Sequence, residues 1–279
     1  MKHFIVWLSI TVMLFGCDGN TPDNNSNIYS TDSIVFNQEQ RFIADQIISV
    51  FENNTPVLQY SYAKNLIDGR GITAGRAGFT TATGDLLEVI ERYTALVADN
   101  PLAVYLPRLR ELADSEDSST QGLEGLEVIW QESASDERFR AVQDEVVDEL
   151  YYGPAIEHAK SLGLSFPLTL LNLFDAVIQH GNGLDPDGLP AMIERTTFNV
   201  GGTPKDGIDE GLWLQEFMNI RRSVLLNPYN QETKNEWSQS VGRVDTLLVL
   251  YYSGNLSLKP PLVIDTWGDV FTIPVNLAS

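Results

Sequence analysis

Apolar residues recur every three or four positions along most of this chain of 279 residues. Within residues 37–51 this spacing is shown by Phe42, Ile43, Ile47, Ile48 and Phe51. Because such spacing places these side chains on one face of a helix, the segment is predicted to be helical. The same pattern predicts a helix that begins near residue 85. Pro167 can open a helix over residues 167–180, and residues 212–226 and 237–252 are predicted to be helical as well. The folded part is therefore predicted to be mainly α-helical.

Residues 68–84 break the helical pattern. Their sequence, DGRGITAGRAGFTTATG, contains five glycines. Glycine at this density permits tight turns and lets the backbone approach a ligand closely. We interpret the segment as a short hairpin or small β-sheet beside a cleft, and a plain connecting loop is the alternative.

The N-terminus resembles a bacterial export signal. Lys2 precedes a short apolar run over residues 4–15, and the sequence LFGC that ends at Cys17 resembles the lipobox of bacterial lipoproteins. Cys17 is the only cysteine, so no internal disulfide is expected. We predict that Cys17 is lipidated; the alternatives are ordinary secretion with a nearby cut and a thiol with a structural or redox role.

These features divide the chain into three parts. Residues 1–17 are the predicted signal peptide, and the polar residues 18–33 are a predicted flexible tether. Residues 34–279 form the predicted folded domain. We expect the protein to be exported, and to be either lipid-anchored to a bacterial membrane or secreted into the extracellular space.

The chain is strongly acidic, with a formal net charge of −20 and a pI of about 4.3. Residues 111–150 alone hold 13 acidic residues and 2 arginines. Such a surface repels the phosphates of nucleic acids and attracts polycations, so no nucleic-acid partner is expected. The alternative is that the acidity only keeps an exported protein soluble.

Two carboxylates are placed where their chemistry would differ. Glu52 follows an apolar helix, where the helix dipole and partial burial would raise its pKa. Asp68 opens the glycine-rich segment, where backbone donors and Arg70 would keep it ionised. A protonated and an ionised carboxyl group are what the hydrolysis of a glycosidic bond requires. With 38 acidic residues in the chain, these positions alone make Glu52 and Asp68 only candidates.

The sequence around these two carboxylates resembles that of glycoside hydrolase family 46 chitosanases. The shared blocks, in order, include Glu52, Tyr60-Ser-Tyr62, Asp68-Gly-Arg70-Gly-Ile-Thr73, Thr83-Gly84-Asp85, Phe174-Asp175, Arg243-Val-Asp245-Thr246 and Trp267-Gly-Asp269. The resemblance covers most of residues 36–273. It implies a mainly α, α+β fold that is lysozyme-like and two-lobed, with a small β-sheet beside the catalytic cleft.

The resemblance also implies roles for individual residues. Glu52 would be the general acid, Asp68 the general base, and Thr73 the residue that helps to hold the attacking water. These enzymes invert the anomeric centre. The implied buried charges that support Glu52 are Asp175, Arg221 and Arg243. The residues implied or suggested to contact the substrate are Asp85, His180 and Tyr62.

Several of these residues have a second interpretation. Arg70 would tune Asp68 and brace the hairpin, or would brace the hairpin alone. Asp85 could cap the helix that follows it. His180 could act as a partner for the end of its own helix. Tyr60 and Trp267, like Tyr62, could line a sugar cleft.

The chain departs from the family pattern at two places. The segment between Glu52 and Tyr60 is about two residues shorter. The segment between Arg221 and Arg243 is about seven residues longer, and it contains no clear counterpart of the family's acidic pair. Glu232 and Glu236 stand in this insertion, but the sequence does not assign either of them to a subsite.

These observations together predict a monomeric, endo-acting chitosanase that acts on chitosan or chitosan oligosaccharides without a cofactor or a metal. The Asp185-Pro186-Asp187-Gly188 turn lacks the downstream ligands of a calcium loop, and the three histidines show no zinc spacing. A polymer of glucosamine is cationic, which agrees with the acidic composition. One alternative is a muramidase-like glycosidase, although the anionic cell wall would be repelled. The other is a surface lipoprotein that binds polycations without cleaving them.

Overall fold

The computed structural model describes residues 34–67 and 69–274. The predicted export signal with Cys17, the predicted tether over residues 18–33 and the proposed base Asp68 lie outside the described residues. In the part of the chain that is described, no helix is long and apolar enough to cross a membrane.

Helix α1 (Gln38–Asn53) carries Glu52 in its last turn. A capping box closes its N-terminus, because the side chain of Asn37 accepts from the amide of Gln40 at 2.8 Å and the side chain of Gln40 accepts from the amide of Asn37 at 3.1 Å. The helix stops at Asn54, which is left-handed with a φ of 52°. The first predicted helix is confirmed and extends slightly further than expected, so Glu52 is held by helical backbone.

A three-stranded antiparallel sheet follows, with the strand order β1 (Ala63–Asn65), β2 (Ile72–Ala74) and β3 (Phe79–Thr80). Thr73 in the central strand pairs with Lys64 on one side and Thr80 on the other. The turn after β2 needs glycine, because a Cβ on Gly75 would lie 2.6 Å from Gln143 and the φ of Gly75 is 76°. The small sheet predicted for the glycine-rich segment is therefore confirmed.

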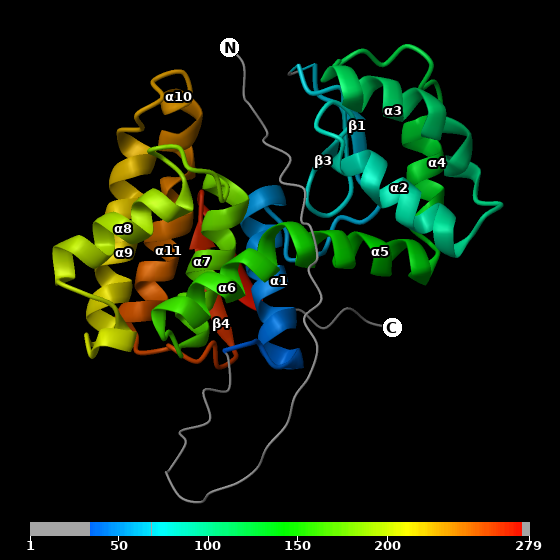
Figure 1. Cartoon of the computed structure of the whole chain (residues 1–279). Coiled ribbons are helices and arrows are strands. Elements are labelled where there is room, and N and C mark those ends of the chain that lie inside the picture. Colours follow the sequence, from blue (N-terminus) through cyan, green and yellow to red (C-terminus); the bar gives the residue numbers. More distant parts are fainter. Residues whose placement is uncertain (1–33, 68, 275–279) are drawn as a thin grey trace, which may run out of the picture. The chain divides into compact units, whose positions relative to one another are not determined.

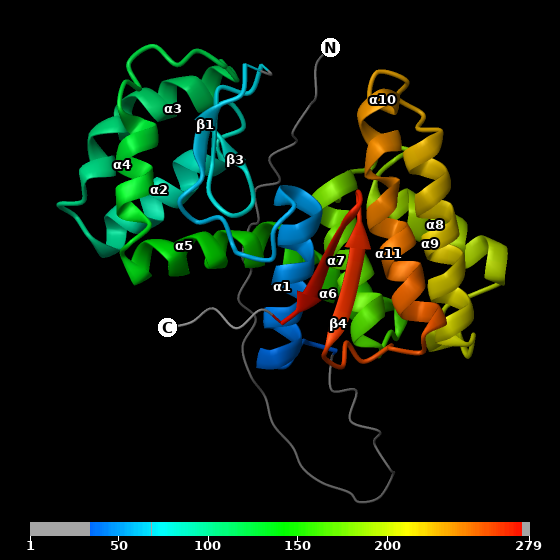
Figure 2. The ribbon, with the colours of Figure 1, turned by 180° about the vertical axis from the view of Figure 1, so that it is seen from behind.

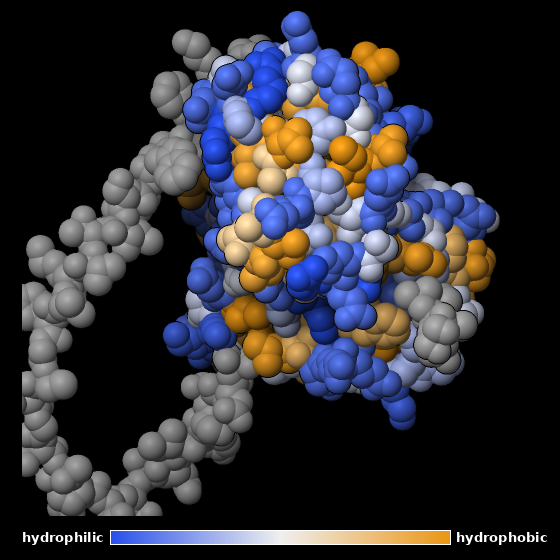
Figure 3. Space-filling view, turned by 90° about the vertical axis from the view of Figure 1, so that its right-hand side faces the viewer, coloured by the Kyte–Doolittle hydropathy of each residue, from blue (hydrophilic) through white to orange (hydrophobic). Residues whose placement is uncertain are grey.

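A first group of helices covers this sheet. It consists of α2 (Asp85–Leu96), the 3₁₀ turn η1 (Pro101–Tyr105), α3 (Leu106–Ser115) and α4 (Leu126–Ser133). Helix α2 contacts β3, and α4 contacts β1 and β2. Trp130 of α4 is fully buried, and its indole nitrogen donates to the carbonyl of Tyr60 at 3.0 Å. Figure 1 shows this group together with the sheet, and Figure 3 shows that its outer face is mostly hydrophilic with small scattered apolar groups.

A long helical segment leads from the first group to a second one (Figure 1). It consists of α5 (Glu137–Val147), a π-helical turn η2 (Asp148–Tyr152) and α6 (Gly153–Leu162). Pro154 stands in the first turn of α6. Proline has no amide hydrogen and its ring clashes with the carbonyl one turn earlier, so the wider π turn accommodates it without ending the helix.

The second group is built around helix α7 (Pro167–His180), which is buried on almost every side. Its neighbours α6, α8 (Leu189–Val200) and α11 (Val241–Tyr252) contact it directly, and α9 (Glu210–Leu226) packs on α8 and α11. The predictions for α7 and α9 are confirmed. The helix predicted over residues 237–252 is divided, because its first residues belong to α10 (Lys234–Trp237) and to the 3₁₀ turn η4 (Ser238–Ser240).

A C-terminal hairpin completes the second group. Its strands β4 (Leu262–Thr266) and β5 (Asp269–Ile273) pair antiparallel, with β4 against α11 and β5 against α1 (Figure 2). The side chain of Asn54, the residue at which α1 ends, donates to Asp269 of the hairpin at 2.6 Å. The hairpin therefore stabilises the C-terminal end of α1. This hairpin was not predicted from the sequence.

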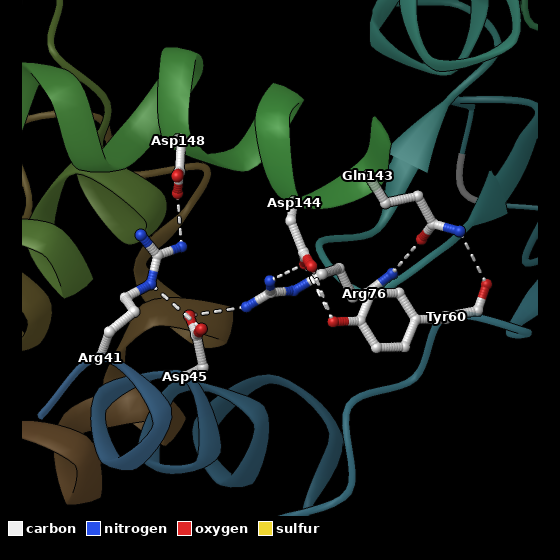
Figure 4. Close-up of polar contacts among 7 residues, drawn as sticks. All are labelled: Arg41, Asp45, Tyr60, Arg76, Gln143, Asp144 and Asp148. Carbon is white, nitrogen blue, oxygen red and sulfur yellow. Dashed lines mark hydrogen bonds and ion pairs between the residues drawn. The ribbon is translucent and has the colours of Figure 1, made fainter. Parts of the chain in front are cut away.

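Arg76 connects the sheet to the long helices (Figure 4). It lies in the turn between β2 and β3, and its guanidinium reaches Asp45 of α1 at 2.6 Å and also contacts Asp144 of α5. The hydroxyl of Tyr60 donates to the same Asp144 at 2.9 Å. Tyr60 is thus engaged in this connection, and its suggested place in a sugar cleft stays a prediction.

The same ion-pair cluster extends along α1 to the π turn. Arg41 contacts Asp45 at 3.0 Å and Asp148 of η2 at 2.5 Å (Figure 4). The guanidinium of Arg41 also lies over the ring of Tyr152, 4.5 Å from its centroid. Opposite charges that alternate in this way neutralise one another, so each member of this cluster has a partner of opposite charge.

Candidate active site

Glu52 projects from the last turn of α1 with its side chain one-third exposed. Its Oε1 accepts from Nη2 of Arg243 at 2.6 Å. Among the described residues no hydrogen bond to Oε2 is recorded. One oxygen of the carboxyl group is therefore fixed by a buried cation, whereas the other remains available to a substrate.

Arg243 belongs to α11 and is buried. Its Nη2 also donates to Oδ1 of Asp175 at 2.7 Å, and its Nη1 contacts the side chain of Gln179. Burial alone would lower the pKa of Arg243, but the charges of Asp175 and Glu52 outweigh it and raise that pKa above its usual value. Arg243 therefore stays positively charged beside Glu52.

Asp175 and Arg221 continue this chain of charges into the core. Both side chains are fully buried, and Nη2 of Arg221 lies 2.5 Å from Oδ2 of Asp175. Burial would raise the pKa of Asp175, but Arg221 and Arg243 lower it. The structure thus brings together Glu52, Arg243, Asp175 and Arg221, as the resemblance implied.

His180 lies behind this chain of charges. Its Nε2 faces Nε of Arg221 at 3.3 Å, and its ring packs edge-on against Trp237 with centroids 4.9 Å apart. Burial and then the charges of Arg221 and Arg243 lower its pKa well below the usual value, so His180 is neutral. With only 7% of the residue exposed, little of His180 is open to a substrate, and its predicted contact with the sugar stays a prediction.

Thr73 is in the central strand of the sheet and is buried. Its hydroxyl has no hydrogen-bond partner among the described residues. A buried hydroxyl without a partner is costly, and it is commonly satisfied by water or by a ligand. Asp68, five positions earlier in the sequence, lies outside the described residues.

Asp85 is the first residue of α2, after the N-cap residue Gly84. Its Oδ1 accepts from the amide of Thr80 at 2.7 Å, the hydroxyl of Thr83 at 2.7 Å and the amide of Leu86 at 2.9 Å. Burial raises the pKa of Asp85, although these hydrogen bonds oppose the shift. Asp85 therefore orders the start of α2 through one oxygen. No hydrogen bond to its Oδ2 is recorded within the described ranges.

A small cavity of about 290 Å³ lies beside Asp85. It is lined by Thr83, Gly84, Asp85, Glu88, Arg92, Val146, Glu149 and Leu150. Glu88 and Glu149 both pair with Arg92, each at 2.5 Å. Asp85 is thus the one acidic side chain in this lining that is not paired with an arginine by a recorded contact.

Tyr151, in the π turn η2, is a residue that the sequence analysis missed. Burial raises its pKa, and the negative charges of Asp85 and Glu52 raise it further, so the phenol lies within electrostatic reach of both carboxylates. The only signal in the sequence was its place in the run Tyr151-Tyr152-Gly153-Pro154, which does not indicate in which direction the side chain points.

Arg70 and Tyr62 support the hairpin through their backbone. The carbonyl of Arg70 accepts from the amide of Ala82 at 3.2 Å, and the carbonyl of Tyr62 accepts from the amide of Gly75 at 2.7 Å. Because the bond at Arg70 uses the backbone carbonyl, any residue at this position could form it, and bracing by the Arg70 side chain stays a prediction. Any tuning of Asp68 by Arg70 stays a prediction, as does the contact of the partly buried Tyr62 with a sugar.

The insertion between Arg221 and Arg243 is anchored by Asp187. The two carboxylate oxygens of Asp187 accept from the amides of Tyr229 at 2.9 Å and Asn230 at 3.0 Å. The turn that resembles the start of a calcium loop therefore holds a protein segment. Glu232 and Glu236 are exposed in the insertion. Across residues 34–67 and 69–274, no group of three potential metal-binding side chains is found.

Comparison with known proteins identifies the family. The sequence profile of glycosyl hydrolase family 46 matches residues 46–262. The chain belongs to glycosyl hydrolase family 46. This membership makes it a glycoside hydrolase and confirms the resemblance seen in the sequence.

Relatives within family 46 agree with this assignment. A chitosanase of Bacillus subtilis strain 168 is 49% identical over 226 residues, which cover 81% of this chain and 82% of the relative. A chitosanase of a Streptomyces species is 35% identical over 83% of this chain and 81% of the relative.

A solved structure from the family shares the fold. The family-46 chitosanase of Gynuella sunshinyii, in complex with chitotetraose, is 59% identical with a TM-score of 0.79. The match covers 86% of this chain and 100% of that one. The predicted fold class, a mainly helical fold with a small antiparallel sheet, is confirmed.

Proposed function

We propose that this family-46 hydrolase is a chitosanase that cleaves β-1,4 bonds within chitosan chains and inverts the anomeric centre. The observation that carries the proposal is the carboxyl group of Glu52, which is held through one oxygen by Arg243. Behind Arg243 stands the buried pair of Asp175 and Arg221. The relatives in which this chain finds its matches are chitosanases.

Glu52 acts as the general acid in this proposal. Its free oxygen carries the proton and donates it to the glycosidic oxygen as the bond from that oxygen to C1 breaks. A negative charge develops on Glu52 during this step. Arg243, already bonded to Oε1 at 2.6 Å, stabilises that charge without reorganisation. Asp175 accepts a hydrogen bond from the same nitrogen of Arg243, at 2.7 Å, so the two carboxyl groups share one cation.

Asp68 acts as the general base. It takes a proton from a water molecule, and the oxygen of this water attacks C1 from the face opposite to the leaving group. Thr73 helps to hold that water, which agrees with its buried and unpartnered hydroxyl. The product then carries the inverted configuration at C1.

The acidic character of the chain and Asp85 select an aminated polymer. A net charge of −20 attracts a cationic chain at long range. Asp85 binds a substrate ammonium group through its Oδ2, while Oδ1 keeps its structural bonds to Thr80, Thr83 and Leu86. Tyr62 and His180 make further contacts with the sugar in this proposal.

We also propose that the enzyme is exported and acts as a monomer. Its signal peptide would end at Cys17, whose lipidation would anchor the catalytic domain through the tether over residues 18–33. The lipobox resemblance and the single cysteine support this part of the proposal.

A reducing-end assay on chitosan, chitin and peptidoglycan tests the proposed reaction. Wild-type protein should release reducing ends from chitosan, whereas Glu52→Gln and Asp68→Asn should each lose roughly a thousandfold or more in kcat. Glu194→Gln changes an exposed glutamate of α8 in the same way and should be fully active.

The stereochemistry and the substrate range give the deciding outcomes. Proton NMR of the first product should show the α-anomer, because a β-linked bond is cleaved with inversion. Chitosan hydrolysis that is undiminished in Glu52→Gln would exclude Glu52 as the acid. Clearing of bacterial cell walls without action on chitosan would identify a muramidase, and chitosan binding without new reducing ends would identify a binding protein.

A further inference from the structure

Gln179 touches the cation that holds Glu52. Gln179 lies in α7, four residues after Asp175, so both side chains project from the same face of that helix. The Nη1 of Arg243 donates to Oε1 of Gln179, and the Nη2 of Arg243 donates to Asp175 at 2.7 Å. Gln179 is partly buried. The family resemblance assigned it no role.

Arg243 has few other restraints within the plane of its guanidinium. Nη2 is shared by Glu52 and Asp175, at 2.6 and 2.7 Å. Nε has no hydrogen-bond partner among the described residues. Phe51 covers one face of the guanidinium, and the Cζ atom of Arg243 lies 5.3 Å from the centroid of its ring. A ring contact of this kind does not fix rotation within the plane of the guanidinium. Gln179 is therefore the second in-plane anchor of Arg243.

The charge of this second anchor matters as much as its position. An amide accepts the hydrogen bond without adding a negative charge, so the positive charge of Arg243 remains directed at the two carboxylates on Nη2. A carboxylate at residue 179 would draw part of that charge away from Glu52. Among the described residues, the other ionisable groups with electrostatic contacts to Glu52 or Arg243 are Asp175 and His180 of α7, Arg221 of α9 and Tyr151 of η2.

We propose that Gln179 is a positioning residue, which aligns Arg243 so that its Nη2 meets Oε1 of Glu52 and leaves Oε2 free for the proton. The proposal rests on the role of Glu52 as general acid. Gln179 acts through Arg243, so its loss should affect the chemical step more than the binding of substrate.

Gln179→Leu removes the anchor while keeping the size of the side chain. We expect kcat on chitosan to fall roughly tenfold with KM changed less than about twofold, since misplacement of a catalytic group costs rate rather than affinity. Gln215→Leu is the matched control. Gln215 is also a partly buried glutamine of the second helical group, bonded to a side chain, the hydroxyl of Tyr252 at 3.0 Å. It should retain wild-type kcat.

Gln179→Glu keeps the contact with Arg243 and adds a charge. The added carboxylate disfavours a second negative charge on Glu52, so the acid should keep its proton to higher pH. We expect the alkaline limb of the pH profile of kcat/KM to move to higher pH in this variant. A side chain at position 179 that does not contact Arg243 would leave that limb in place. The readout remains informative even if Gln179→Leu folds poorly.

Three outcomes separate this proposal from the proposed function. If Glu52→Gln is inactive while Gln179→Leu matches wild type in kcat, or while Gln179→Glu leaves the pH profile unchanged, the positioning role is wrong and the acid assignment stands. If Gln179→Leu raises KM alone, Gln179 contacts the sugar directly and the positioning role is again wrong. If Glu52→Gln remains active, the proposed function itself fails.

Discussion

At the scale of single residues, the most consequential group is Asp175, which is fully buried between two arginines. Asp175→Asn would leave Arg221 and Arg243 as buried cations with no carboxylate between them. Removing one partner from a buried ion pair costs about 3 to 5 kcal/mol, so we expect the free energy of unfolding to fall by that amount. Urea unfolding at neutral pH measures it.

A surface pair provides the control for Asp175. Asp245 contacts Arg222 at 2.7 Å, but the two side chains are 45% and 43% exposed. Solvent screens such a pair, so Asp245→Asn should cost less than about 1 kcal/mol. Equal losses in the two variants would contradict the importance given to the buried chain of charges.

The pH dependence of the free energy of unfolding offers a second measure of the contribution of Asp175. The pKa of Asp175 is lower in the folded protein than in the unfolded chain, so the ionised form favours folding. Its contribution is complete above the unfolded value of about 3.9 and is lost as the pH falls through the lower folded value. The stability difference between wild type and Asp175→Asn should therefore be constant near neutral pH and shrink in strong acid.

The identities of these residues could be predicted from the sequence, but their geometry could not. Family motifs pointed to Glu52 and Arg243, which are 191 positions apart. Spacing alone carries no information about contacts over such a distance. The sequence assigned no role to Gln179 or Tyr151, and only the packing of α7 against α11 and the position of η2 brings them to the site.

At the scale of secondary-structure elements, Arg76 ties the hairpin that contains Thr73 to α1 and α5. Its side chain is 5% exposed, and that of its partner Asp45 is 11% exposed. Arg76→Met should therefore destabilise the fold by about 2 kcal/mol, because Asp45 would keep only Arg41 as a partner and Asp144 would lose its arginine. It should also lower kcat/KM, because Thr73 would be less well placed relative to Glu52 at the end of α1. Thermal unfolding and the chitosan assay measure the two effects.

Arg92→Met is the matched control for Arg76→Met. Arg92 likewise contacts two carboxylates, Glu88 and Glu149, but these are 44% and 64% exposed. The expected loss of stability is below about 1 kcal/mol. A comparable loss in both variants would show that the connection through Arg76 has no special part in joining the two helical groups.

The elements were predictable where the pattern was strong. Helix α1 follows from the spacing of its apolar residues, and helix α7 from Pro167 in its first turn. The hairpin of β4 and β5 escaped prediction, because Val263 and Val270 are exposed although they are apolar, which hides the alternation of a half-buried strand. The π turn η2 arises because Pro154 cannot continue a regular α-helix. The periodicity of apolar residues does not reveal this local effect.

At the scale of the whole molecule, the net charge of −20 should make the reaction sensitive to salt. The screening length falls from about 30 Å at 0.01 M to about 10 Å at 0.1 M ionic strength, so long-range attraction of a cationic polymer is lost over this range. We expect kcat/KM on chitosan to fall several-fold between these conditions, mostly through KM, because the attraction promotes encounter with the substrate.

Acetylation of the substrate provides the control for this electrostatic effect. Each acetyl group removes a positive charge from the polymer, so partly acetylated chitosan should show a smaller decrease of kcat/KM with salt than fully deacetylated chitosan under the same conditions. A salt response that is independent of acetylation would mean that salt acts on the enzyme itself. In that case the acidity of residues 111–150 would serve solubility, and the choice of an aminated substrate would depend on contacts within the cleft, such as the one proposed for Asp85.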